Sequence, residues 1–179
     1  MDKEKKKQFL KIFRIVVIIL LLYAIFKGVL GILILSILIL LSLSMSYIVN
    51  IYGLRQFGLE LVTLVGVLAG VKYGPLPAFI LTFVLITYHL LAGGFFAQYV
   101  FWVIPSYSIA GALAGFFSGI DIAILGLYLT LGINITNTFF TAITSPGYLF
   151  KYLPFAITNV IFNAILFATI AKPLSLLMI

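Results

Sequence analysis

The sequence predicts an all-α fold: a bundle of transmembrane helices, with six core helices plus an extra N-terminal hydrophobic segment. Hydrophobic residues make up 64% of the 179 residues and charged residues only 8%, whereas a soluble domain is about half apolar and a quarter charged. The apolar runs 15–26 and 29–43 do not alternate with polar residues, as the strands of a membrane β-barrel would. Because lipid offers backbone N–H and C=O groups no other partner, these runs are predicted to be helices.

The N-terminal part of the chain divides into a basic head, residues 1–14, and the extra hydrophobic segment, residues 15–28. The head is expected to lie in the cytoplasm and to touch anionic lipid head groups. The apolar stretch itself extends from about residue 9 to residue 26, and Lys27-Gly28 is expected to end it. No small-residue cleavage site follows, so a signal peptide is not expected. The basic residues of the head are Lys3, Lys5, Lys6, Lys7, Lys11 and Arg14.

The membrane domain, residues 29–179, is divided by turn signals into six expected helices. Gly74-Pro75 ends a short one, because proline suits the first turn of the helix that follows. Pro105 is expected to bend the fourth helix. Ser145-Pro146-Gly147 predicts a loop over residues 144–153, and Lys172-Pro173 is expected to end the last helix. The expected helices cover residues 29–49, 59–71, 76–92, 98–119, 122–143 and 154–171.

Small residues recur four positions apart in two of these segments. Hydrophobic attraction between helices is weak in lipid, so close helix contact depends on small side chains. The positions predicted to pack against another helix are Gly66, Gly70, Gly111 and Gly115.

Few residue types that carry catalysis are present, and an enzyme is not expected. The chain has no cysteine and a single histidine, His89, so neither a transition-metal site nor a metal cofactor is expected. Outside the head the acidic residues are Glu60 and Asp121, and the sequence has no nucleophile-elbow, zinc-protease or phosphate-loop motif. Most of the net charge of +7 lies in the head, so nucleic acid is not an expected partner.

Polar and aromatic residues within the apolar segments each have two interpretations. His89 is either a hydrogen-bonded packing residue or part of a site, and Asn159 and Asn163, four apart, either bond only a neighbouring helix or line a site. Arg55 either pairs with Glu60 or faces a ligand. One aromatic group forms either an interfacial belt or a stacking wall for a flat ligand; it comprises Phe95, Phe96, Tyr99, Phe101 and Trp102.

Several stretches go beyond composition. Residues 58–75 read GLELVTLVGVLAGVKYGP, residues 90–94 LLAGG, residues 107–115 YSIAGALAG and residues 153–159 LPFAITN. From about residue 29 to the C-terminus, the chain resembles the substrate-binding S components of energy-coupling factor transporters. The segment 29–49 departs from that family, because it lacks the alanine-rich face that docks the coupling protein.

The resemblance implies a multi-pass protein of the cell membrane that binds a vitamin-type micronutrient near the outer face. A transmembrane coupling protein with ATPase subunits would be its partner in the bilayer. Loops 50–58, 92–98 and 144–153 would close over the ligand, and Arg55→Ala or Asn159→Ala would weaken binding roughly tenfold and spare folding. The expected binding residues are Tyr52, Arg55, Gln56, Glu60, His89, Gln98, Tyr99, Asn137, Tyr148, Lys151 and Asn159.

Two other functions and one conflict of topology stay open. A membrane scaffold of the cell-shape type would be a packed bundle whose polar residues bond each other, and a small ion or proton channel would use Glu60 and His89. If the segment before residue 28 crosses the membrane separately, the following loops are inverted. A hairpin or non-crossing segment would keep the S-component orientation, and this arrangement is slightly favoured.

Overall fold

The computed structural model describes the backbone of residues 3–92 and 97–178. The side chains described are those of Ile18 and of residues 28–178 other than Arg55 and residues 93–96. The described residues form helices and no strand, which confirms the all-α prediction. The elements are α1 (Lys3–Ile51), η1 (Leu54–Phe57), α2 (Val62–Tyr73), α3 (Pro75–Leu91), α4 (Val100–Phe116), α5 (Ile122–Thr144), η2 (Pro146–Tyr148), α6 (Leu149–Leu166), η3 (Phe167–Ala171) and α7 (Lys172–Leu177).

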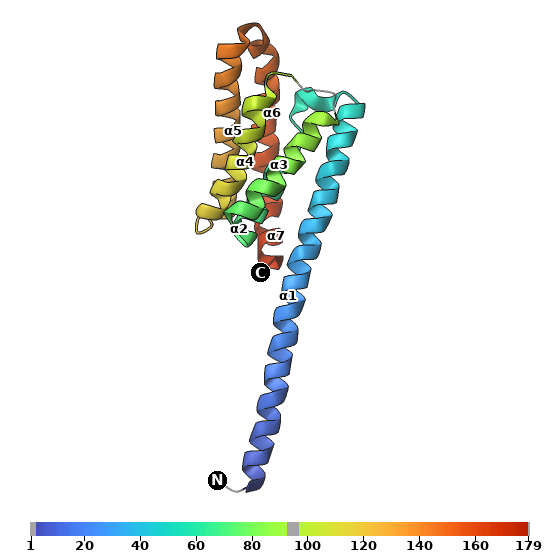
Figure 1. The fold of residues 1–179 in the computed structure, drawn as a ribbon, viewed down its shortest axis with the longest axis vertical. Coiled ribbons are helices and arrows are strands. Elements are labelled where there is room, and N and C mark those ends of the chain that lie inside the picture. The colour runs from blue at the N-terminus through green and yellow to red at the C-terminus, as the bar shows by residue number, and fades with distance from the viewer. Residues whose placement is uncertain (1–2, 93–96, 179) are drawn as a thin grey trace.

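The first helix differs from the prediction. α1 runs unbroken for 49 residues through the expected break at Lys27-Gly28, so a hairpin at this point is wrong. A lone glycine costs a helix only about 1 kcal/mol, and neither a proline nor a turn sequence accompanies it. At 1.5 Å per residue α1 is about 74 Å long, and Figure 1 shows its N-terminal half extending well past the other helices.

The short helix α2 lies at the centre of the bundle. It contacts α1, α3, α4, α5 and α6, and every residue from Val62 to Gly70 is buried. Such a helix needs no amphipathic stripe, because it is enclosed on all sides. The turn at Gly74 then sends the chain back along α3, as the sequence predicts.

The C-terminal helix departs from its expected boundaries at both ends. The turn at Pro146–Tyr148 already reverses the chain, so α6 begins at Leu149, five residues before Pro154. Lys172-Pro173 does not end it either. A π-helical turn, Phe167–Ala171, precedes α7, and this wider turn accommodates a proline that cannot donate a backbone hydrogen bond.

The four predicted packing glycines lie where α2, α3 and α4 cross. A Cβ atom at Gly70 would stand 2.6 Å from the Gly111 carbonyl oxygen, and one at Gly115 would stand 2.5 Å from Pro75 N. Cβ atoms at Gly66 and Gly111 would both meet the Thr82 hydroxyl. Only glycine allows these backbones to approach so closely.

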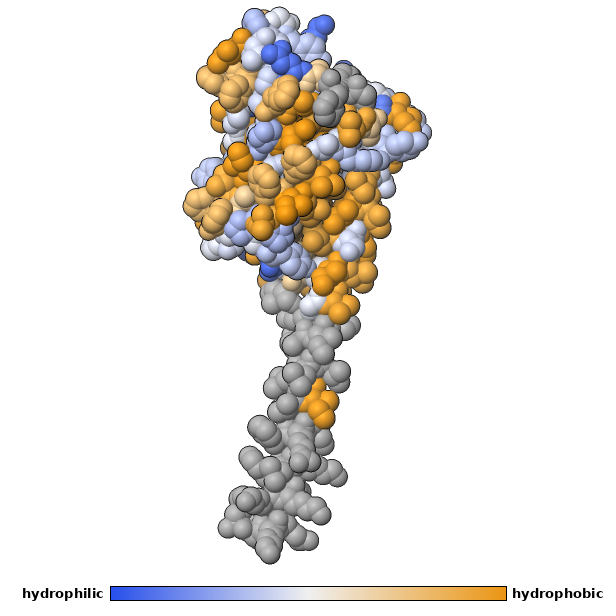
Figure 2. Space-filling view, in the orientation of Figure 1, coloured by the Kyte–Doolittle hydropathy of each residue, from blue (hydrophilic) through white to orange (hydrophobic). Residues whose placement is uncertain are grey.

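Three helical stretches are long and apolar enough to cross a membrane: Gly28–Ile51, Ile122–Thr144 and Pro146–Leu177. In Figure 2 hydrophobic residues cover much of the middle of the bundle, and strongly hydrophilic residues lie towards its ends. The described parts of loops 52–61, 92–99 and 145–148 lie at one end of the bundle, and the N-terminus of α1 points away from the other. We name these the loop end and the N-terminal end.

Candidate functional site

The loop between α1 and α2 is pressed against α6 at one glycine. Gly58 has a φ of +57°, and a Cβ atom there would lie 2.6 Å from the Phe155 carbonyl oxygen and 2.7 Å from Asn159 N. Glycine is therefore required both by the left-handed backbone and by the close approach. The contact brings the Gly58 carbonyl to 2.8 Å from Asn159 Nδ2 and sets the next residues, including Glu60, against α6.

Glu60 is inside the bundle, with 1% of its surface exposed. Its Oε1 accepts hydrogen bonds from Thr63 Oγ1 at 2.6 Å, Asn163 Nδ2 at 3.0 Å and Asn159 Nδ2 at 3.4 Å. Its Oε2 accepts one from the Thr63 backbone N–H at 2.9 Å. The carboxylate thus satisfies a free N–H at the start of α2, where negative charge is also favoured by the helix dipole.

Three asparagines from α5 and α6 are connected to Glu60, two of them directly and Asn134 through Asn159. Asn134 donates to Asn159 Oδ1 at 2.8 Å and to the Thr130 carbonyl at 2.9 Å, and Asn163 also donates to the Asn159 carbonyl at 3.2 Å. All three side chains are at least 95% buried. We call Glu60, Thr63, Asn134, Asn159 and Asn163 the Glu60 cluster; it joins residues that are up to 103 positions apart.

A second polar group lies next to this cluster, between the ends of α4, α5 and α6. Tyr107, which is almost fully buried, lies beside Thr63, Glu60 and Tyr152. Ser106 donates to Asn137 Oδ1 at 3.0 Å. One turn towards the loop end, the rings of Trp102 and Phe140 stack with 6.0 Å between their centroids. The polar residues therefore extend from α2 and α6 across to α4.

Both polar groups contain buried atoms that have no hydrogen-bond partner. Among the described residues these atoms are Asn134 Oδ1 and Asn163 Oδ1 in the Glu60 cluster, and Trp102 Nε1 and the Tyr152 hydroxyl, which lies near the Asn137 side chain, in the second group. Buried polar atoms are nearly always paired, so each exception calls for an explanation such as a bound molecule or water. Two unpartnered oxygens and two unpartnered donors in adjoining groups indicate a site that its own side chains leave incomplete.

His89 belongs to a separate contact between α1 and α3. Its Nδ1 lies 2.9 Å from Ser46 Oγ, and Asn50 donates to the His89 carbonyl at 3.1 Å. This hydrogen bonding fits the packing interpretation of His89. The half-buried imidazole shares none of these partners with Glu60.

The expected binding residues do not all surround one cavity. Glu60, Asn137 and Asn159 are buried in the two polar groups, and His89 and Tyr99 are half-buried. The rest of the described set is exposed, and Lys151 Nζ lies 5.9 Å from the centre of the Tyr148 ring. The side chain of Arg55 lies outside the described residues, as do Phe95 and Phe96. The exposed members are Tyr52, Gln56, Gln98, Tyr148 and Lys151.

Two hollows are described, and both are open grooves rather than enclosed cavities. One, of about 490 Å³, lies along the start of α4 and is lined by Gln98, Phe101 and Pro105 among others. The other, of about 330 Å³, lies between α4 and α5 beside Ser106, Ala110 and Gly132. A small-molecule site is usually a deep cleft or cavity, and neither of these two grooves is enclosed. Neither groove is lined by Glu60 or Asn159.

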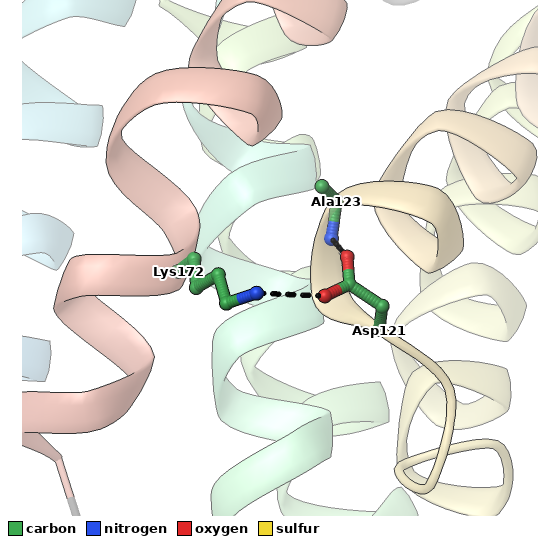
Figure 3. A network of polar contacts seen from close by, with 3 residues as sticks. All are labelled: Asp121, Ala123 and Lys172. Carbon is green, nitrogen blue, oxygen red and sulfur yellow. Dashed lines mark hydrogen bonds and ion pairs between the residues drawn. The ribbon is translucent and has the colours of Figure 1, made fainter.

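The N-terminal end of the bundle carries a different kind of polar contact (Figure 3). Lys172 Nζ lies 3.3 Å from Asp121 Oδ2, and Asp121 Oδ1 caps α5 by accepting from the Ala123 N–H at 2.9 Å. The Ala123 N–H and then Lys172 hold the pKa of the Asp121 carboxyl below its ordinary value. Both side chains are well exposed, so this contact ties α5 to α7 at the surface.

The main residues that the expected site omitted are Thr63, Tyr107, Asn134, Asn163 and Tyr152. Asn159 and Asn163, and Thr130 and Asn134, are spaced four apart, and this spacing is the signal that places them on one helix face. Nothing in the sequence pairs these faces with Glu60. Their pairing depends on how α2, α5 and α6 pack.

The unpartnered atoms of the described residues offer hydrogen bonds to a small polar group. Within the described residues no three His, Cys, Asp or Glu side chains gather as ligands for a metal. Comparisons of the chain with family models, curated proteins and solved structures gave no match.

Proposed function

We propose that this chain is the membrane-embedded substrate-binding subunit of a micronutrient uptake transporter, of the S-component type. The observation that carries the proposal is the pair of adjoining polar groups with four buried, unpartnered atoms. They lie towards the loop end, where the sequence resemblance implies a ligand beneath three loops. Trp102 and Phe140 would cover an aromatic face of the ligand while Tyr152 and the asparagines bind its polar edge.

The continuous helix α1 gives this proposal a consistent topology. One helix crosses the membrane once, so a cytoplasmic basic head puts the loop end outside. The conflict between the head and the S-component orientation then disappears. The chain would be a multi-pass protein of the cell membrane, and the three loops would face the source of the micronutrient.

Neither groove reaches the Glu60 cluster, so the loop end would open to admit a ligand. Gly53 and Gly58 lie in left-handed backbone on either side of η1, and the Gln56 carbonyl is held by a long 3.4 Å bond from Thr158. Such a short segment can move without breaking a helix. Opening it would withdraw the Gly58 carbonyl from Asn159 and expose the Glu60 cluster.

A membrane scaffold of the cell-shape type is the second candidate. It is favoured by the bonding of Glu60 to Thr63, Asn159 and Asn163, since a scaffold is expected to pair its polar residues with each other. The open grooves agree with it as well. A channel is less well supported, because His89 and Glu60 bond to different partners.

Native mass spectrometry of the gently purified protein separates the two candidates. A binding subunit should retain a small molecule, and titration calorimetry should then find the same compound in a vitamin panel. Trp102→Ala and Arg55→Ala should weaken its binding roughly tenfold or more, while Phe150→Ala, an exposed position on α6, should leave the affinity unchanged. A protein that neither retains nor binds any compound, but is isolated with other membrane proteins, would support the scaffold.

A further inference from the structure

The Glu60 carboxylate is buried, and no cationic side chain that the structure describes pairs with it. Its hydrogen bonds come from a backbone amide, a hydroxyl and two asparagines. All four partners donate to the carboxylate oxygens. Neutral donors lower the cost of burying an anion but leave its charge uncompensated.

Two asparagines near Glu60 carry further oxygen atoms that accept no hydrogen bond from the described residues. Asn134 and Asn163 use their NH2 groups within the cluster, and the amide oxygen of each is buried and unpartnered. Glu60 Oε2 accepts a single bond, although a carboxylate oxygen can accept about two. The cluster therefore has oxygen atoms that can still accept hydrogen bonds or contact a positive charge.

One carboxylate with neutral oxygens matches a single positive charge. Sites for Ca²⁺ and Mg²⁺ rely on carboxylates in larger number or on substrate phosphates, and the described residues place no second carboxylate beside Glu60. Oxygen ligands also disfavour the soft transition metals. The chemistry that remains is a monovalent metal ion or an organic ammonium group.

We propose that the Glu60 cluster binds a single positive charge, carried either by a monovalent metal ion or by a cationic group of the transported molecule. For the organic cation the inference rests on the proposed function and narrows the substrate to cationic compounds. For the inorganic ion it holds whether or not the chain is a transporter subunit.

The test is the melting temperature of the full-length protein in detergent, at constant ionic strength, with N-methylglucamine chloride replaced by sodium, potassium or methylammonium chloride. At a saturating concentration at least one of the three should raise the melting temperature of the wild type by about 5 °C. Glu60→Gln keeps the shape but not the charge, so it should abolish the rise. Asp121→Asn, which removes the exposed carboxylate at the other end, should retain it.

Which of the three salts raises the melting temperature identifies the source of the positive charge. A response to sodium or potassium assigns an ion site, and a response to methylammonium alone assigns a subsite for a cationic ligand. No response to any of them, or an equal response in Glu60→Gln, would overturn the inference. Should Glu60→Gln not fold, binding of radioactive sodium to the wild type, competed by methylammonium, decides the matter: no binding, taken with no melting response, overturns it.

The result is separable from the fate of the proposed function. A neutral compound retained by the protein without any cation response would leave the transporter proposal intact and refute the cation site. A melting response to sodium or potassium in a protein that binds no compound would support the cation site and refute the transporter proposal.

Discussion

The body of α2 and its start are held in the bundle by different kinds of contact. Along its length, Gly66 packs against the Thr82 side chain of α3, and Gly70 packs so closely against α4 that a Cβ atom at Gly70 would stand 2.6 Å from the Gly111 carbonyl oxygen. At its start, α5 and α6 hold it through the Glu60 cluster, a set of hydrogen bonds among buried polar side chains. One contact depends on shape and the other on polar chemistry.

The difference bears on where the proposed binding site lies. The glycine crossing is stabilised by close van der Waals packing, which is what drives helix association in lipid. Only the Thr82 hydroxyl lacks a partner there. The polar region at the start of α2 is more expensive to bury, and four atoms in it and beside it stay unpartnered. Buried polar atoms without a partner are uncommon, and their number here makes this region the better candidate for a binding site.

The largest expected effect concerns which side of the membrane each end faces. On this cysteine-free background, Ser145→Cys at the loop end should react with an impermeant thiol reagent added to intact cells. Lys5→Cys in the basic head should be protected, because α1 separates the two positions by one crossing. The matched control is Ser118→Cys, an exposed position at the N-terminal end of the bundle. Labelling of Ser118→Cys with protection of Ser145→Cys would reverse the orientation.

The next largest effect is expected inside the polar region. Asn159→Ala removes bonds to Gly58, Glu60 and Asn134 at a fully buried position. Leaving these groups unsatisfied should cost about 3 kcal/mol of unfolding free energy, measured by reversible denaturation in detergent. The sequence-based expectation that this substitution spares folding is therefore revised. Exposed Gln98→Ala should change the stability by less than about 0.5 kcal/mol, and equal stability of the two variants would contradict the network.

A smaller change in unfolding free energy, of opposite sign at two glycines, tests the packed region. Gly70→Ala places a methyl group against the backbone of α4 and should cost about 1–3 kcal/mol. Gly132→Ala on α5 meets nothing within 4 Å and should gain up to about 1 kcal/mol, because alanine favours the helix. Loss of stability in Gly132→Ala would show that another molecule occupies this side of α5.

The sequence was informative about elements and less so about their connections. Apolar runs, Gly74-Pro75 and the spaced glycines predict the six-helix domain and its close-packed faces, because those signals are local. The continuity of α1 was missed because Lys27-Gly28 is only a weak helix breaker. The early start of α6 is not predicted, because Pro154 suits the first turn of a helix although the turn at Pro146 already precedes α6.

The candidate site was only partly predictable for a physical reason. Glu60 and Asn159 stand out as polar residues in apolar segments, but their mutual contact spans 99 positions and follows from the packing of separate helices. Exposed loop residues such as Tyr52 and Tyr148 were included because a family resemblance assigns roles to loops. Their exposure leaves them as candidates that only loop closure would bring to a ligand.

The smallest effect is expected from the surface contact that closes the N-terminal end. Asp121 caps α5 and pairs with Lys172, and these partners lower its pKa. A carboxyl whose pKa is lower in the folded state stabilises the fold above its unfolded pKa, and this contribution is lost as the pH falls through the folded value. Asp121→Asn preserves the cap and should lower the melting temperature only slightly at pH 7, since an exposed ion pair contributes little. Melting curves at pH 7 and pH 3 provide the measurement: the difference between variant and wild type should shrink at pH 3, where the wild-type carboxyl also begins to lose its charge. A large loss of stability at pH 7 would mean that the ends of α5 and α7 depend on charge as strongly as the start of α2 depends on its hydrogen bonds.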